Sequence, residues 1–554
     1  MSSKSPSWHR RRVPLPIFLI LIALFTILGL STMDLRSIDS SSKFPIKNRT
    51  LEMLGKEAIS ANKTSNELLQ PNVRKTCATV EEMGEIFSRG YTEESLRVRR
   101  IIHNHFALNG ASRVRELHPE EFCSHGFVIG KASEAGLGNE LYKLLTAGAL
   151  SVMLNRSLII GQTRHIGLYP FGDYISYSNI SFTLKEVKHL WRQNRCLTKY
   201  GRHLTMRIDD FQKPARTGVL CSNWREWEQP IIWFQNTTDA AAAQFFLRNV
   251  HPEMKEAAFD LFGGPENLQY RANVFGELMR ILMGPSRDVE WAVNWALKGG
   301  SDPDIALHMR MMMNRSVRAK QAALDCLKKA VHNNIPMISK PKVVLLSDTP
   351  SMVKDIAAGL EELAEVIHFD HKHFDGNVSG NGNEIKNLSF RVKDWGPAPR
   401  WVAFVDFFLA SRSKHAVISG AHRRVGTTYA QLIAALAAAY RLDEQAQNNS
   451  SITFLSSFQS NLLSDGLKNQ VGWGHVWNRF AGPLSCRGQQ SQCALTPVLP
   501  PAWWDGLWQS PIPRDSRRME SYGVKLSGFG TIDDGLLKDF CRSRKNWVVG
   551  VQLI

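Results

Sequence analysis

The sequence predicts an α/β fold with two Rossmann-like parallel-sheet domains facing a cleft, preceded by an N-terminal transmembrane helix and a stem. Strands alternate with helices in two separate stretches, which is typical of parallel sheets covered by helices. A chain of 554 residues is also too long for one core. The transmembrane helix is predicted by an apolar run that follows a cluster of arginines near the N-terminus.

The N-terminal segment predicts a membrane anchor. Residues 1–12 end in three consecutive arginines and form a cytosolic tail, and residues 13–33 are apolar enough for a transmembrane signal anchor. The positive-inside rule then places the rest of the chain in the lumen. A cleaved signal peptide is the alternative, but the run exceeds a typical signal core and has no clear cleavage site.

Sequons and cysteines agree with a luminal body that follows a polar stem at residues 34–76. The even number of cysteines permits up to four disulfides in an oxidising compartment, and the absence of CxxC pairs argues against zinc. The cysteines are at positions 77, 123, 196, 221, 326, 486, 493 and 541. The glycosylation sequons begin at Asn48, Asn62, Asn155, Asn179, Asn236, Asn314, Asn377, Asn387, Asn448 and Asn449.

The net charge of +17 favours anionic partners. Nucleotide-sugar phosphates, acidic glycans and a membrane surface all fit this charge. The sequence has no zinc-finger, basic-zipper or RNA-binding signature, so we expect no nucleic-acid partner.

Residues 77–300 form the first predicted Rossmann-like domain. A charged helical stretch precedes a βαβ unit, and a less regular Trp-rich region follows with one further helix. The expected elements are a helical stretch over 77–121, strands at 126–130 and 157–160, and helices at 139–154 and 240–249.

The turn of this βαβ unit is rich in glycine. Gly136, Gly138 and Asn139 lie where glycines allow a backbone to approach a ligand closely. The alternative is a tight turn with Asn139 as the N-cap of the helix. Spacing alone leaves both interpretations open.

Residues 301–445 form the second predicted Rossmann-like domain, and residues 446–554 a Trp-, Pro- and Gly-rich extension. Thr349 is expected as an N-cap, with Pro350 at the first helical position. The expected strands are 305–309, 342–346, 366–369 and 416–418, and the expected helices are 318–333, 350–364, 400–412 and 425–441.

Two segments of this domain are suited to binding an anion. His308 and Arg310 project to one side of a strand, and Arg310 lies at the carboxyl end, where open parallel sheets bind ligands. Its guanidinium matches phosphate bidentately, although an arginine paired with a carboxylate is the structural alternative. Gly426, Thr427 and Thr428 begin a helix, and helix N-termini attract anions; the alternative is a capped helix beside a solvated basic loop.

Two other clusters contain residue types that can bind metals, but their positions argue against a metal site. The histidines at 368, 371 and 373 lie in a Gly- and Asn-rich loop, where solvated side chains are the better interpretation. The acidic pairs Asp302/Asp304 and Asp209/Asp210 resemble those of metal-dependent GT-A glycosyltransferases. The first pair precedes its strand, which favours a loop, so we expect no metal.

Together, and in this order, the segments resemble the fucosyltransferase superfamily with the GT-B fold, including plant fucosyltransferase-like and O-fucosyltransferase-like type II membrane proteins. The tail is loosely similar to that of plant cell-wall fucosyltransferases. The segments that carry the resemblance are 136–160 for the first motif, 308–310 for the second, 345–350, 406–411, and 419–420 with 426–428 for the third.

The resemblance implies a Golgi glycosyltransferase, single-pass type II, that transfers fucose from GDP-fucose to a glycan or protein hydroxyl with inversion and without metal. GDP-fucose is then a donor substrate, and no cofactor is expected. Arg310 would bind the diphosphate and support departure of the leaving group, Asp406 would contact guanine, and Glu134 would be the general base. Donor-binding residues expected beside these are Gly136, Gly138, Asn139, His308, Asp348, Ser419, Gly426, Thr427 and Thr428.

Two departures from the family pattern motivate an alternative. Residues 421–424 differ from the usual third motif, and three methionines follow Arg310 where polar residues are common. A catalytically silent glycan- or nucleotide-binding protein on the same scaffold is therefore the second hypothesis.

Overall fold

The structure is a computed structural model, and it describes a set of segments after the predicted stem. These are residues 90–131, 136–161, 164–165, 169–210, 218–235, 249–263, 272–311, 317–334, 340–374, 399, 401–421, 427–442, 452–457, 493–495, 525–526, 532–543 and 548–554. All of them belong to one compact unit, Arg74–Ile554. The predicted cytosolic tail, anchor and stem lie outside the described residues. Within the described segments, no helix is both long and apolar enough to cross a membrane.

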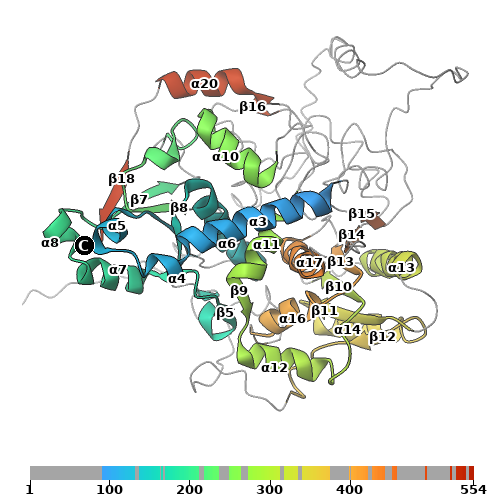
Figure 1. Cartoon of the computed structure of the whole chain (residues 1–554). Helices are drawn as coiled ribbons and strands as arrows, with labels where there is room; N and C mark the ends of the chain where they lie inside the picture. Colours follow the sequence, from blue (N-terminus) through green and yellow to red (C-terminus); the bar gives the residue numbers. More distant parts are fainter. Residues whose placement is uncertain are drawn as a thin grey trace, which may run out of the picture. The chain divides into compact units, whose positions relative to one another are not determined.

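The first sheet has six strands in the order β18-β7-β8-β1-β2-β6. Figure 1 labels the three strands at one edge, β18, β7 and β8. Five strands run parallel, and β18, from the end of the chain, pairs antiparallel with β7 at the edge. The strands are β1 (Phe127–Gly130), β2 (Ser157–Ile160), β6 (Phe182–Thr183), β7 (Thr205–Asp210), β8 (Ile231–Gln235) and β18 (Val549–Gln552).

The second sheet repeats this plan in the order β12-β11-β10-β13-β14-β15, with β15 antiparallel at the edge. The α/β prediction with two Rossmann-like, mainly parallel sheets is thereby confirmed. The strands are β10 (Ile305–Arg310), β11 (Lys342–Ser347), β12 (Glu365–Ile367), β13 (Ala416–Ala421), β14 (Thr453–Ser457) and β15 (Cys493–Leu495).

Helices connect the strands and cover the sheets. In the first half they are α3 (Tyr91–Asn109), α4 (Ala111–Val114), α5 (Pro119–Ser124), α6 (Leu137–Leu154), α7 (Leu184–Gln193), α8 (Cys196–Tyr200), α10 (Pro252–Phe262), α11 (Val274–Leu282) and α12 (Arg287–Ala296). In the second half they are α13 (Val317–Asn334), α14 (Pro350–Ala358), α16 (Val402–Ala410), α17 (Thr428–Arg441) and α20 (Asp534–Ser543).

Short elements complete the described residues. They are the 3-10 turns η1 (Phe171–Asp173) and η3 (Trp224–Glu226), and the two-stranded pairs β3 (Arg164–His165) with β4 (Tyr169–Pro170), β5 (Ile175–Tyr177) with β9 (Met283–Pro285), and β16 (Lys525–Leu526) with β17 (Ile532–Asp533).

Some predicted boundaries were wrong. Gly136 is the N-cap of α6, so Asn139 lies inside the first turn rather than at the cap. Helix α14 ends at Ala358 instead of 364, because the chain turns at Gly359 before β12. Thr349 takes the N-cap position, but its hydroxyl lies 3.4 Å from Asp348 Oδ1 and does not cap the helix. The predicted helix at 240–249 lies outside the described residues except for its last residue.

Alternate strand residues divide the interior into three cores. Ile129 and Ile159 face α5 and α7 on the outer side of the first sheet, and Leu307 and Leu345 face α13 and α14 on the outer side of the second. The inner faces of both sheets contribute to one continuous core, which α6, α11, α16 and α17 fill between them. The two sheets are therefore joined by shared apolar packing.

A buried ion pair holds α17 inside this shared core. Arg99 of α3 bonds both carboxylate oxygens of Glu277 in α11, at 2.8 and 3.0 Å. The same guanidinium donates to the carbonyl oxygens of Ala439 and Leu442 at the carboxyl end of α17, each at 2.8 Å. Residues of the first half thus fix a helix of the second half.

Three disulfides connect distant parts of the chain. They join Cys123 to Cys196, Cys221 to Cys541 and Cys326 to Cys493, and no cysteine among the described residues is free. The other two cysteines of the sequence lie outside those residues. Disulfides of this kind indicate an oxidising, secretory compartment, as the cysteine pattern predicts.

Candidate functional site

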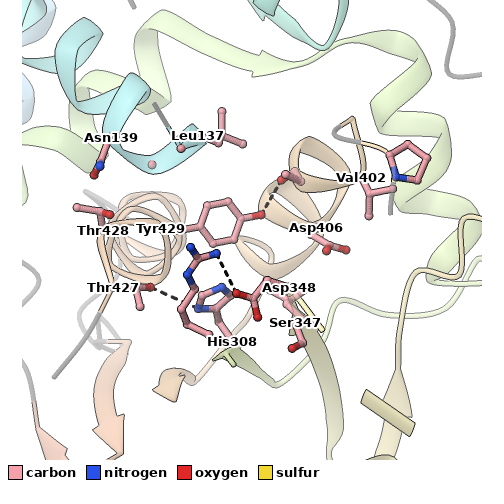
Figure 2. Close-up of a pocket in the computed structure, with 16 residues that line it drawn as sticks. Leu137, Asn139, His308, Ser347, Asp348, Val402, Asp406, Thr427, Thr428 and Tyr429 are labelled. Atoms are coloured by element: carbon pink, nitrogen blue, oxygen red, sulfur yellow. Dashed lines mark hydrogen bonds and ion pairs between the residues drawn. The ribbon is translucent and has the colours of Figure 1, made fainter. Parts of the chain in front are cut away.

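A pocket of about 320 Å³ opens at the carboxyl end of β10, where α6, α16 and α17 meet (Figure 2). It is at the edge where parallel sheets usually bind ligands. Its lining is Gly136, Leu137, Gly138, Asn139, His308, Arg310, Leu346, Ser347, Asp348, Pro399, Val402, Ala403, Asp406, Thr427, Thr428 and Tyr429.

Arg310 ends β10 and pairs with Asp348, which follows the adjacent strand β11. Its Nη1 lies 2.9 Å from Asp348 Oδ2, and the Arg310 side chain stays 35% exposed. Asp348 is itself fixed, because its Oδ1 accepts the backbone N–H of Met311 at 2.8 Å. Arg310 is therefore both paired with a carboxylate and part of the pocket wall, and a guanidinium has five N–H donors with which to do both.

Thr427 caps α17 at the base of the pocket and contacts His308. Its Oγ1 accepts the N–H of Ala430 at 3.1 Å and lies 3.3 Å from His308 Nδ1. Burial, the largest effect, lowers the pKa of His308 to about 4, so the ring is neutral. If the Thr427 hydroxyl donates to Nδ1, the ring proton is on Nε2, which leaves His308 as a hydrogen-bond donor there.

Ser419 supports this cap from behind the pocket. Its buried Oγ accepts the N–H of Thr427 at 3.1 Å, and it does not line the cavity. The backbone N–H groups in the first turn of α17 have no acceptor within the helix. The positive end of the helix dipole points at the pocket. The arrangement is suited to an anion.

Gly138 allows the first turns of α6 and α17 to touch. A Cβ at this position would lie 2.8 Å from the Tyr429 nitrogen, 3.0 Å from its Cα and 3.1 Å from the Thr428 carbonyl carbon. These are backbone atoms, which cannot rotate away. The glycine is thus required for helix-to-helix contact at the pocket wall, a role that the sequence did not predict.

Asp406 of α16 contributes a carboxylate that lacks a partner. Its Oδ1 is buried and has no hydrogen-bond partner among the described residues, and burial raises the pKa of Asp406 to about 8. A ligand that offers N–H donors would satisfy this oxygen. Apolar neighbours, Val402 and Ala403 among them, line the same side of the pocket and are suited to a flat ring.

Tyr429 crosses the pocket from α17 to α16, as Figure 2 shows. Its hydroxyl donates to the Ala403 carbonyl at 2.6 Å, and its ring centroid lies 5.1 Å from that of His308. Tyr429 and the apolar lining were not predicted from the sequence. Tyr429 directly follows the Gly-Thr-Thr segment, which is the one signal that could have drawn attention to it.

The structure brings most of the predicted donor-site residues together. Glu134 and Gly426 lie outside the described residues. Those that line the pocket are Gly136, Gly138, Asn139, His308, Arg310, Asp348, Asp406, Thr427 and Thr428.

The acidic pairs have structural partners elsewhere. Asp304 bonds Lys414 at 3.2 Å and Asp302 bonds Arg441 at 3.3 Å, at the amino end of β10 and away from the pocket. Asp209 pairs with Arg207 at 2.9 Å inside β7. Across the described segments, no three His, Cys, Asp or Glu side chains come together as a metal site.

Comparisons with known proteins give one family and several similar folds. A family of unknown function (DUF7810) matches residues 72–553. No curated protein matches the sequence. Among solved structures, a mutant of FUT1 from Arabidopsis thaliana in complex with GDP is similar, with 12% identity, coverage of 70% of this chain and 85% of that chain, and a TM-score of 0.39.

Two other fucosyltransferases show similar values. Fucosyltransferase NodZ from Bradyrhizobium has 12% identity over 60% of this chain and 96% of its own, with a TM-score of 0.33. POFUT1 in complex with GDP-fucose has 11% identity over 60% of this chain and 98% of its own, with a TM-score of 0.33. The structural similarity to fucosyltransferases that the motifs predict is thus found, and at these values it assigns neither activity nor donor.

Proposed function

For this chain, which belongs to a family of unknown function (DUF7810), we propose a glycosyltransferase that binds a nucleotide-sugar donor in the pocket between α6, α16 and α17. We further propose that it transfers fucose from GDP-fucose to a glycan or protein hydroxyl, with inversion and without a metal. One observation carries the proposal: the side chain of Arg310, the first turn of α17 and the unpartnered oxygen of Asp406 line one pocket.

The diphosphate would lie between Arg310 and α17. Arg310 supplies a permanent charge, and the hydroxyl of Thr428 and the free N–H groups of the helix supply hydrogen bonds. Asp348 holds the guanidinium in place before the ligand arrives. Negative charge develops on the leaving diphosphate, and donors that are already positioned stabilise it without reorganisation.

The base would occupy the apolar side of the pocket. Guanine presents two adjacent N–H donors on one edge, which suit the carboxylate of Asp406, and Val402 and Ala403 would contact its ring. The motif resemblance supports fucose as the sugar, whereas the pocket chemistry supports only a guanine nucleotide diphosphate.

Glu134 remains our proposal for the general base. Of the described residues that line the pocket, only Asp348 and Asp406 are carboxylates. Asp348 is engaged by Arg310, and Asp406 lies in the position proposed for guanine. The base would therefore come from the first-motif loop at 132–135, to which Glu134 belongs. It would deprotonate the acceptor hydroxyl.

The disulfides and the N-terminal segment support the compartment that we propose. We propose a Golgi membrane protein of type II, with residues 13–33 as the anchor and the catalytic region in the lumen. The three disulfides support a luminal body.

A silent nucleotide-binding protein is the second candidate. It is favoured by the ion pair between Arg310 and Asp348, which gives the arginine a structural role as well. The two candidates differ in turnover and not in GDP binding.

The test is a donor screen with purified full-length protein, with and without EDTA. GDP-fucose, GDP-mannose and UDP-galactose are titrated, and hydrolysis or transfer is measured for each. We expect preference for GDP-fucose and turnover that survives EDTA. GDP binding without turnover of any donor would support the silent nucleotide-binding protein. Absence of GDP binding would refute both of these candidates and would leave glycan binding without nucleotide, the other form of the silent alternative.

The variant Arg310→Ala tests the catalytic assignment. We expect turnover to fall about 100-fold or more, since removal of one preorganised donor typically costs 10²–10³. Arg287→Ala is the control, because that arginine is 96% exposed on α12. Wild-type turnover in Arg310→Ala would refute the role of Arg310.

A further inference from the structure

A second pocket, of about 540 Å³, lies at the amino ends of three neighbouring strands, β1, β2 and β8. It is formed mainly by α4, α5, the end of α6 and the loops that lead into these strands. Three arginines line it, and Glu121 is the one carboxylate in the lining. The arginines are Arg113, Arg156 and Arg202.

Arg156 brings a buried positive charge that has no counter-ion in the part of the chain that the structure describes. It is 9% exposed, and among the described residues its guanidinium donates only to the backbone carbonyls of Trp227, Gln229 and Pro230. Gly126 makes room for it, since a Cβ there would lie 3.0 Å from three atoms of the Arg156 side chain. Backbone carbonyls satisfy its donors but do not neutralise its charge.

The other two arginines, Arg113 and Arg202, add positive charge and, within the described segments, bring no paired carboxylate into the pocket. Arg202 Nη2 makes one long bond, 3.5 Å, to the Glu228 carbonyl, and neither Arg202 nor Arg113 has an ion pair among the described residues. Burial, and then the charge of Arg202, lower the pKa of Arg156 to about 10. The guanidinium groups thus repel one another, and an anion among them would relieve that repulsion.

The walls of the pocket are preformed. The N–H of Arg202 donates to the Cys196 carbonyl at 2.9 Å, and its own carbonyl accepts from Trp191 Nε1 at 2.9 Å. The disulfide between Cys123 and Cys196 joins α5 to α8 next to these contacts. A ligand would therefore meet arginine backbones that are already fixed, which reduces the entropic cost of binding.

The remaining titratable group in the lining is neutral. His125 Nε2 lies 2.8 Å from Ser157 Oγ, whose hydroxyl donates to the Asn109 carbonyl, so Nε2 carries the ring proton. Burial, and then the charge of Arg156, lower the pKa of His125 to about 4. At neutral pH the lining has three positive charges against the one carboxylate of Glu121.

We propose that this second pocket is a binding site for a small anion bearing a carboxylate, sulfate or phosphate group, with Arg113 and Arg202 as its hydrogen-bond donors. The site is separate from the proposed donor site. Helix α6 lines the first pocket with Leu137 and the second with Leu154, and its 18 residues span about 27 Å. One nucleotide sugar cannot fill both, so the occupant is a second ligand: an acidic sugar of a glycan or a free inorganic anion.

Binding of sodium sulfate and of sodium glucuronate to the purified full-length protein tests the proposal. Both are titrated against sodium chloride at matched ionic strength, with melting temperature and calorimetry as readouts, because unspecific screening affects all salts alike. We expect saturable binding of at least one probe. Arg202→Gln should weaken the binding of that probe about tenfold, as expected for loss of one charge-assisted bond. Adding Arg113→Gln to that variant should weaken the binding further.

Arg192→Gln is the matched control, because Arg192 is an exposed arginine of α7 outside the pocket. Tighter binding of glucuronate would assign the site to an acidic sugar, and tighter binding of sulfate to an inorganic anion. GDP affinity should be unchanged in Arg202→Gln, which separates this site from the donor pocket. Equal anion affinity in Arg202→Gln and Arg192→Gln, or no saturable binding of either probe, would overturn the proposal.

Discussion

Replacing Gly138 by alanine tests whether the contact between α6 and α17 shapes the proposed donor site. In an ordinary helix this change is stabilising by about 0.5–1 kcal/mol, because alanine loses less backbone entropy than glycine. The contact here predicts the opposite sign. The new Cβ would meet the Tyr429 nitrogen at 2.8 Å and its Cα at 3.0 Å.

The expected magnitude follows from what can move. Both neighbours are backbone atoms of a helix whose far end is held by Arg99, so α17 cannot shift without disturbing the shared core. Overpacking of this kind costs about 1–3 kcal/mol in the free energy of unfolding. Displacement of the first turn of α17 should also weaken GDP binding, and a loss of 1 kcal/mol corresponds to about fivefold in Kd.

Urea unfolding and GDP calorimetry on the full-length protein measure both effects. Gly172→Ala is the matched control, because a Cβ at that glycine of η1 would meet nothing within 4 Å. We expect the control to match the wild type within about 0.5 kcal/mol. A Gly138→Ala protein that is as stable as the wild type and binds GDP equally well would refute the reasoning.

Further predictions concern Asp406 and one disulfide. Because the pKa of Asp406 is raised to about 8 in the folded protein, the folded state holds a proton that the unfolded state has lost between about pH 4 and 8. The free energy of unfolding should therefore fall as pH rises through this range. Asp406→Asn should remove this pH dependence in urea titrations, and an unchanged dependence in that variant would contradict the prediction. GDP affinity should rise with pH up to about 8, by at most about tenfold per pH unit. Calorimetry in two buffers should show that a proton is released on binding. The same pH dependence of GDP affinity in Asp406→Asn would argue against a contact between Asp406 and guanine. The double variant Cys221→Ser/Cys541→Ser should lose about 2–5 kcal/mol of unfolding free energy, and no loss would show that β18 and α20 are held without this disulfide.

The strands and the location of the site were predictable because they follow from local patterns. Buried apolar runs such as 305–309 and 342–346 have few alternatives to a central parallel strand. Parallel strands place their carboxyl ends at one edge, so Arg310 and Asp348 had to lie near each other once β10 and β11 were neighbours. This is why separate motifs converge on one pocket.

The remaining features depend on contacts between residues far apart in sequence. The sequence leaves open whether the glycines of this turn admit a ligand or form a tight turn, and in the structure the space beside Gly138 is filled by the backbone of Tyr429. The partner of Arg310 was not predicted, since a strand pattern indicates which side a residue faces and not which carboxylate it meets. Helix ends such as Ala358 were misjudged because the chain turns there for the next strand.

Helix α17 explains why the pocket depends on both halves of the chain. Its first turn lines the pocket, its small residues pack closely on α11, and Gly276 approaches so nearly that a Cβ would clash with the Ala435 carbonyl. Asn273 Nδ2 also donates to that carbonyl, at 2.6 Å. A ligand that binds the N–H groups of α17 therefore acts on a helix anchored at its start, middle and end by first-half residues. It follows that substitutions at the contact between α11 and α17 should change nucleotide affinity without touching the nucleotide.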